Sequence, residues 1–168
     1  MVLNPSSVAQ TMITIPGGGI PFDHKSQVQQ NGIDLRLCSA MQLMHGDEAL
    51  NIAAKDMAKR WEVSALDGDT KTGALVLHSG CTYEIRFIEH IKVADKAMGW
   101  VRPRSRFVRN GIHMWSGVFD TGFEGQLGCM LHILGPRRIK VVPGERMAQL
   151  VMWEADHASL YDGDWKNA

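Results

Sequence analysis

Residues 82–90 read TYEIRFIEH, and their polar and apolar side chains alternate in the manner of a β-strand with one buried face. Six other short segments, rich in Val, Ile, Leu and aromatic residues, have the same character: IDLRLC (33–38), GALVLHS (73–79), WVRPRS (100–105), LGCMLHIL (127–134), RIKVV (138–142) and AQLVMWE (148–154). Turn dipeptides separate them, namely Asp67-Gly68, Ser79-Gly80, Asn110-Gly111, Thr121-Gly122 and Pro143-Gly144. Short strands at this spacing predict an all-β domain built as a sandwich, jelly roll or barrel.

The remaining segments are predicted to add little regular structure. A chain of 168 residues can bury a real core, and no internal repeat divides it, so we expect one domain over residues 1–168. Helix formers over residues 47–58 predict one short helix. Prolines and glycines predict an irregular N-terminal arm over residues 1–30, and residues 155–168 are expected to form a polar C-terminal tail whose two aromatic rings dock on another surface.

Composition excludes several classes of protein. The chain has 18 Lys and Arg against 18 Asp and Glu, whereas proteins that bind nucleic acid polymers usually carry a basic surplus. Cys38, Cys81 and Cys129 form no zinc motif, and we expect buried thiols in a reducing cytoplasm. We find neither a signal peptide nor the roughly 18 to 20 apolar residues of a membrane helix, so a soluble cytoplasmic protein without a membrane partner is expected.

The richest source of phosphate ligands is the segment 101–128. Arg102, Arg104, Arg106 and Arg109 crowd beside Ser105. Guanidinium groups offer forked donors suited to phosphate oxygens, and serine adds a hydroxyl. The alternative is a solvated strand face whose charges pair with acidic residues elsewhere.

Residues 118–125, VFDTGFEG, predict a tight hairpin that a ligand can approach closely. Asp120 follows an apolar pair, and Gly122 and Gly125 flank Phe123. Glycine permits positive φ and leaves the backbone accessible. A plain capped hairpin, in which Asp120 satisfies turn amides, is the alternative.

Two more polar residues stand in or beside apolar runs. Gln149, in PGERMAQL (143–150), either hydrogen-bonds inside the core or faces a ligand. Asp34, in NGIDLRL (31–37), places a carboxylate where a turn enters a strand, and a simple turn aspartate is the alternative interpretation.

In chain order these segments resemble the first four sequence motifs of the dUTPase superfamily, which includes the dCTP deaminases. NGIDLRL is similar to the first motif, PRSRF (103–107) to the second, SGVFDTGFEGQLG (116–128) to the third and PGERMAQL to the fourth. The resemblance spans about residues 31–154. It implies a distorted β-barrel or jelly-roll-like protomer, and a homotrimer with active sites between subunits.

The resemblance also implies roles for the matching residues. Asp120 would orient and deprotonate the attacking water, and Asp34 would hold hydrated Mg²⁺ through water. Phosphate binding is implied for Arg104, Ser105, Arg109, Gln149 and Lys166. Nucleobase and sugar binding is implied for Gly122, Phe123, Gly125 and Leu127, and a lid for Tyr161 and Trp165. Hydrolysis at the α-phosphorus needs these elements: a base, a divalent ion and donors for developing charge.

Three features depart from the family pattern. Dedicated deaminases carry a glutamate ten residues after the third-motif aspartate, and here that position is Met130, which cannot transfer protons. His132, on the same strand face, is the only substitute nearby, and we expect it to be a partly buried structural histidine. Arg106 stands where dUTPases usually have glycine. The tail resembles the deaminase branch, with Asp164 where a lysine is common.

The resemblance therefore favours a dUTP diphosphatase that hydrolyses dUTP to dUMP and pyrophosphate with Mg²⁺. A dCTP deaminase, alone or bifunctional, and a non-catalytic nucleotide-binding regulator are the alternatives, and release of pyrophosphate from dCTP is a further one. The retention of Asp120, Arg104 and Ser105 argues against a pure binder, which does not need a carboxylate to orient water.

Overall fold

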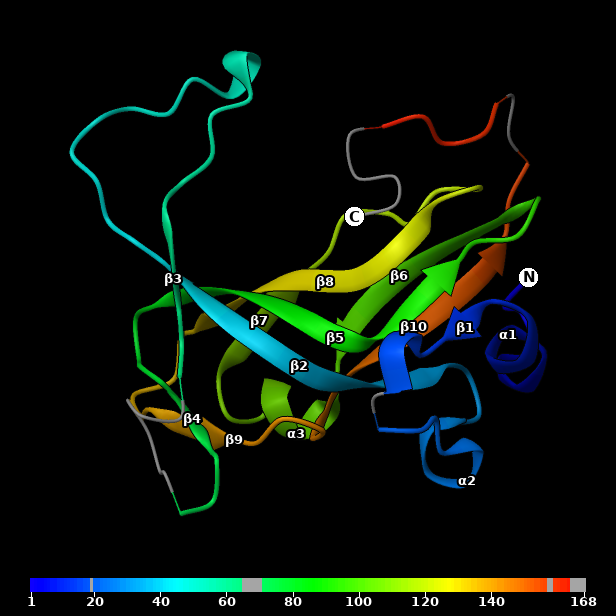
Figure 1. The fold of residues 1–168 in the computed structure, drawn as a ribbon, viewed down its shortest axis with the longest axis horizontal. Coiled ribbons are helices and arrows are strands. Elements are labelled where there is room, and N and C mark those ends of the chain that lie inside the picture. The colour runs from blue at the N-terminus through cyan, green and yellow to red at the C-terminus, as the bar shows by residue number, and fades with distance from the viewer. Residues whose placement is uncertain (19, 65–70, 157–158, 164–168) are drawn as a thin grey trace.

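The computed structural model describes residues 1–168 except 19, 65–70, 157–158 and 164–168 (Figure 1). The helices are α1 (Pro5–Thr11), α2 (His24–Gln27) and α3 (Ser105–Val108), with 3₁₀ turns at Pro16–Gly18 and Ile52–Ala54. The strands are β1 (Ile13–Thr14), β2 (Ile33–Leu43), β3 (Arg60–Glu62), β4 (Leu75–Leu77), β5 (Thr82–Lys92), β6 (Ala97–Pro103), β7 (Ile112–Trp115), β8 (Glu124–Ile133), β9 (Ile139–Val141) and β10 (Arg146–Glu154).

The strands form an antiparallel, barrel-like sheet, which confirms the predicted fold class. Its order is β6-β10-β2-β5-β8-β7, with β1 added to β5 and β3 to β2, while β4 pairs with β9. β6 and β7, at the two ends of this order, contact each other, so the sheet is nearly closed. The register shifts within β2, β5 and β10, and such irregularities bend strands and increase their twist.

Alternation along the two central strands builds the core. Every second side chain of β5 is buried, beginning with Tyr83, Ile85 and Phe87, and β8 follows the same period with Leu127 and Leu131. Glu89 is also fully buried on this face of β5 and is satisfied by polar partners.

The partners of Glu89 tie α2 to the sheet. Its carboxylate accepts hydrogen bonds from Gln27 Nε2 at 2.7 Å, from Arg36 Nε at 2.7 Å and from the Arg36 backbone amide at 2.9 Å. Gln27 Nε2 also donates to the Asp34 carbonyl at 2.8 Å. Since an unpaired charge in the core is costly, these contacts make α2 part of the fold.

Two local predictions are wrong. The helix predicted over residues 47–58 is absent: only a 3₁₀ turn forms, at Ile52–Ala54, because residues 44–57 are exposed and bury no apolar face. The predicted irregular arm instead contains α1, which Asn4 caps and whose Val8 and Ala9 join the core.

Two other expectations concern the burial of the cysteines and the presence of a membrane helix. Of the three cysteines, only Cys129 is buried; Cys81 is half-buried and Cys38 exposed. Over the described part of the chain, no helix combines the length and apolarity that a membrane crossing requires.

Candidate active site

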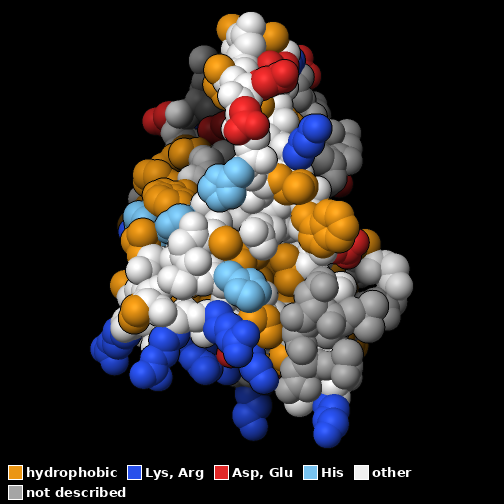
Figure 2. Space-filling model, turned by 90° about the vertical axis from the view of Figure 1, so that its left-hand side faces the viewer, with side chains coloured by type: hydrophobic (Ala, Val, Ile, Leu, Met, Phe, Trp, Pro, Cys, Tyr) orange, Lys and Arg blue, Asp and Glu red, His pale blue; other side chains and the backbone are white. Residues whose placement is uncertain are grey.

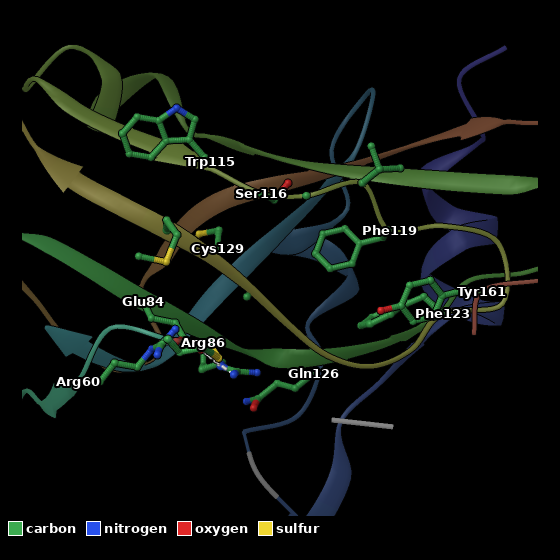
Figure 3. A pocket seen from close by; sticks show the side chains of 15 residues that line it. Arg60, Glu84, Arg86, Trp115, Ser116, Phe119, Phe123, Gln126, Cys129 and Tyr161 are labelled. Atoms are coloured by element: carbon green, nitrogen blue, oxygen red, sulfur yellow. Dashed lines mark hydrogen bonds and ion pairs between the residues drawn. The ribbon is translucent and has the colours of Figure 1, made fainter. Parts of the chain in front are cut away.

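The segment between β7 and β8 borders two cavities, which share Tyr161. The first, here called the aromatic cavity, has a volume of about 380 Å³ and is lined by Trp115, Phe119, Phe123 and Tyr161, among others (Figure 3). The second, here called the Asp120 cavity, has a volume of about 350 Å³ and also contains Thr121 and Asp156. Both volumes are in the range of small-molecule sites.

Backbone hydrogen bonds hold the hairpin at residues 119–123 against β6. Phe119 exchanges two bonds of 2.9 Å with Gly99, and Thr121 Oγ1 donates to the Ala97 carbonyl at 2.6 Å. Gly122 takes φ 80°, a conformation that glycine adopts without strain. The buried Phe119 faces the aromatic cavity, whereas the exposed Asp120 faces the other one.

A charged triad, Arg60, Glu84 and Arg86, lines one side of the aromatic cavity (Figure 3). Glu84 Oε1 accepts from Arg86 Nε at 2.7 Å and lies 2.6 Å from Arg86 Nη2, while Glu84 Oε2 pairs with Arg60 Nε. Glu84 is the register partner of Met130 across β5 and β8. From the sequence, Glu84 and Arg86 belong to the polar face of a strand; only the register brings them to this cavity.

Asp34 anchors a separate polar cluster. Its buried carboxylate lies 3.3 Å from Arg104 Nε and 3.4 Å from Arg146 Nη1, and Gln149, its register partner on β10, hydrogen-bonds to it. Burial raises the pKa of Asp34, and the two guanidinium groups and Gln149 oppose that rise. The structure thus brings together three of the predicted residues, Asp34, Arg104 and Gln149. It adds Arg146, to which the sequence motifs assign no role.

Two other predicted phosphate ligands, Ser105 and Arg109, lie near this cluster rather than near the hairpin. Ser105 begins α3 and Arg109 follows its end, and both are exposed. Lys and Arg side chains gather along the lower edge of the face in Figure 2, at the height of α3 and β9 in Figure 1, whereas Asp and Glu gather near the top. Neither cavity is lined by Arg104, Ser105 or Arg109, so one chain divides the predicted site between two places.

The predicted base and sugar residues occupy the hairpin and the first half of β8. Phe123 lines the aromatic cavity and packs on Phe119, with ring centroids 5.3 Å apart. Leu127 is fully buried in the core, and it lines neither cavity.

Leu160 and Tyr161 of the C-terminal tail lie on the hairpin of their own chain, and Gly163 is the last described residue. The Tyr161 ring meets Phe123 edge-on at 5.7 Å, and the Tyr161 amide donates to the Thr121 carbonyl at 2.8 Å. The predicted lid residue Trp165 and phosphate ligand Lys166 are outside the described residues.

Met130 and His132 occupy the same half-buried face of β8, as the two-residue strand period predicts. His132 Nδ1 lies 2.7 Å from Thr82 Oγ1, so this histidine has a local partner on β5. Met130 lines the aromatic cavity and His132 does not.

The residues that the structure describes do not fit a magnesium site. Within the described ranges, no group of three His, Cys, Asp or Glu side chains is placed to hold a metal ion. The predicted metal residue, Asp34, is 1% exposed and faces two guanidinium groups. Magnesium prefers several oxygen ligands and keeps its waters, which this surrounding does not provide.

The sequence places the chain in a known family, and its fold agrees with that family. The family described as dCTP deaminase-like matches residues 6–155, and the chain belongs to that family.

Curated relatives carry two kinds of name. The chain is 28% identical over 141 residues to the probable deoxyuridine 5′-triphosphate nucleotidohydrolase of Halobacterium salinarum, covering 84% of each chain. It is 28% identical over 148 residues to the enzyme named deoxyuridine 5′-triphosphate nucleotidohydrolase in Methanocaldococcus jannaschii, covering 86% of this chain and 92% of that one. The dUMP-forming dCTP deaminase of Methanobrevibacter smithii is 26% identical over 133 residues, covering 78% and 69%.

Solved structures share the fold. The dCTP deaminase of Agrobacterium tumefaciens superposes with a TM-score of 0.65 at 18% identity, over 90% of this chain but only 46% of that one. A point mutant of the dUTPase from Staphylococcus bacteriophage 80alpha superposes with a TM-score of 0.58 at 12% identity, over 90% and 86% of the two chains.

Proposed function

We propose that this protein is a dUTP diphosphatase that converts dUTP to dUMP and pyrophosphate. The observation that carries the proposal is the third-motif hairpin, which retains Asp120 at a cavity while the deaminase acid is replaced by Met130. The nucleotidohydrolase names of the relatives from H. salinarum and M. jannaschii support the same activity.

In this proposal the base lies in the aromatic cavity and Asp120 acts beside it. Aromatic rings at Phe119, Phe123 and Trp115 suit a planar heterocycle with a sugar behind it. Phe119 and Asp120 are adjacent residues that face different cavities, and both cavities are lined by Tyr161. The proposal has the nucleotide place its base in the aromatic cavity and extend past Tyr161 to the carboxylate. An ionised carboxylate there orients water toward the α-phosphorus and accepts its proton.

Phosphate binding requires a second subunit in this proposal. Arg104, Ser105, Arg109 and Gln149 lie away from both cavities of their own chain. We propose a homotrimer in which these residues of one subunit meet the hairpin of a neighbour, with Lys166 assisting. Light scattering should give the mass of three chains at micromolar concentration, and dilution to monomers should remove activity in parallel. A monomeric mass for the active protein would contradict this arrangement.

Magnesium is the remaining part of the proposal. The dUTPase of phage phi11, which shares the fold, is described with a structural Mg(II) ion. Because the described part of the chain has no residues that fit a magnesium site, no catalytic step is assigned to the ion. Its requirement is measured by assaying the protein with and without Mg²⁺.

Deamination of dCTP is the second candidate, favoured by the name of the relative from M. smithii. Met130 lacks a proton to transfer, and Glu84, its register partner on β5, has both oxygens engaged by guanidinium groups. A carboxylate whose two oxygens are both engaged by guanidinium groups is not free to contact a departing ammonia.

Product analysis separates the two activities. Purified protein is incubated with dUTP and with dCTP, and chromatography follows dUMP, dUTP and pyrophosphate. We expect dUMP and pyrophosphate from dUTP and no uracil-containing product from dCTP. Deamination of dCTP at a rate comparable to dUTP hydrolysis would overturn the proposal.

A further inference from the structure

Arg86 reaches the aromatic cavity because its partner on β8 has no side chain. The register pairs Arg86 with Gly128. A Cβ atom at Gly128 would lie 3.3 Å from Arg86 Cδ and 3.0 Å from the Ile85 carbonyl oxygen, so the arginine stem fills the space above the glycine. Its guanidinium group is thereby directed across β8 to the wall that Gln126 also lines (Figure 3).

The charged triad fixes the orientation of that guanidinium group. Glu84 binds Arg86 through Nε and Nη2, which leaves Nη1 without a partner among the described residues. Guanidinium carries five N–H donors and accepts none, so the group offers the cavity donors only. The Arg86 side chain is 24% exposed, which leaves it open to a ligand.

Gln126 supplies the complementary acceptor. Its Nε2 donates to the Phe87 carbonyl at 2.7 Å, and only the amide nitrogen can donate to a carbonyl. This bond fixes the orientation of the amide and leaves Oε1 as the acceptor. Gln126 lies two residues from Gly128 on the same face of β8, and both the Gln126 amide and the Arg86 guanidinium group line the aromatic cavity.

We propose that Arg86 and Gln126 read the base edge and select a 4-keto pyrimidine, uracil or thymine, over cytosine. Uracil presents a keto oxygen at position 4 beside an N–H at position 3, which match a guanidinium donor and an amide acceptor. Cytosine presents an amino donor beside a bare ring nitrogen, so both contacts become donor against donor or acceptor against acceptor. A site built for hydrogen bonds rejects such an analogue strongly because its own polar groups lose their partners. Glu84 is a positioning residue that holds Arg86.

This inference rests on the proposed function for the location of the base, and a binding assay tests it separately. Calorimetry compares α,β-imido dUTP and the corresponding dCTP analogue on wild-type protein and on Arg86→Met, Gln126→Leu and Arg60→Met. Arg60 is the matched control, because it also pairs with Glu84 but donates its Nη1 to the Ala58 carbonyl.

We expect Arg86→Met to weaken the dUTP analogue by about tenfold or more while the dCTP analogue changes by less than about threefold. Gln126→Leu should likewise lower the ratio of dUTP-analogue affinity to dCTP-analogue affinity, and Arg60→Met should change this ratio less. Equal losses for both analogues, or an unchanged ratio, would overturn the inference even if the protein hydrolyses dUTP. If the wild type binds the dUTP analogue selectively but releases no pyrophosphate, the inference stands and the diphosphatase proposal fails. Thermal melting of each variant verifies folding, and Gln126→Leu alone decides if Arg86→Met does not fold.

Discussion

Replacing Asp120 by Asn removes one negative charge at nearly constant size, and the structure predicts a large catalytic effect with little effect on folding. The side chain is exposed, and the hairpin is held by backbone groups, including the Phe123 amide, which donates to the Asp120 carbonyl at 3.0 Å. The free energy of unfolding should therefore change by no more than about 0.5 kcal/mol. Turnover of dUTP should fall by about 100-fold or more, the usual cost of losing a catalytic base.

Pyrophosphate release measures the turnover, and calorimetry with α,β-imido dUTP measures binding, which should be nearly unchanged because the aromatic cavity is intact. Asp156→Asn is the matched control, since Asp156 lines the same cavity as Asp120 but has no assigned role in the reaction. An Asp120→Asn protein that keeps more than about a tenth of wild-type turnover would refute the assignment. Equal losses of turnover in the two variants would show that the total charge of the Asp120 cavity matters, rather than a single catalytic carboxylate.

Three further outcomes follow from the structure. Glu89→Ala should lower the free energy of unfolding by about 3–5 kcal/mol, because it leaves Arg36 buried without its partner, and the melting temperature should drop by about 10 °C; an unchanged melting curve would contradict this. Burial lowers the pKa of His90 below 6.5, so the unfolded chain binds a proton at this histidine more tightly than the folded chain does. The free energy of unfolding therefore decreases as the pH falls below 6.5. His90→Gln should reduce this dependence on pH, which a single proton limits to about 1.4 kcal/mol per pH unit. Deleting residues 160–168 should reduce dUTP turnover at least tenfold if the tail closes over the nucleotide; unchanged activity would make the tail a spectator.

The strands could be predicted from the sequence because alternation is a local signal. β5 and β8 carry it over ten or more residues, whereas β2 and β10 are equally long or nearly so but alternate over only part of their length. β1, β3 and β7 are only two to four residues long, and their pairing depends on neighbours distant in the chain. The α1 helix had a readable signal that was missed: Asn4 followed by Pro5 is a favourable N-cap and first helical residue.

The candidate site was predictable only where a motif lies in one continuous segment. The hairpin at residues 118–125 and the Asp120 position follow from local sequence. The ion pairs of Asp34 with Arg104 and Arg146 depend on the pairing of three strands. Proline and glycine content predicted an irregular N-terminal arm, but tertiary packing of apolar residues decided its structure.

The aromatic cavity still contains an acid, although not where the deaminase pattern places it. Glu84 stands on β5 directly opposite Met130, and two guanidinium groups occupy its oxygens. With two positive charges and one negative, the triad presents hydrogen-bond donors to the cavity. In the proposed reading of the base, these donors suit a keto oxygen and not an amino group. Met130→Glu alone should then not create a deaminase. The new acid would face the base, but Arg86 and Gln126 would still not form complementary hydrogen bonds with cytosine.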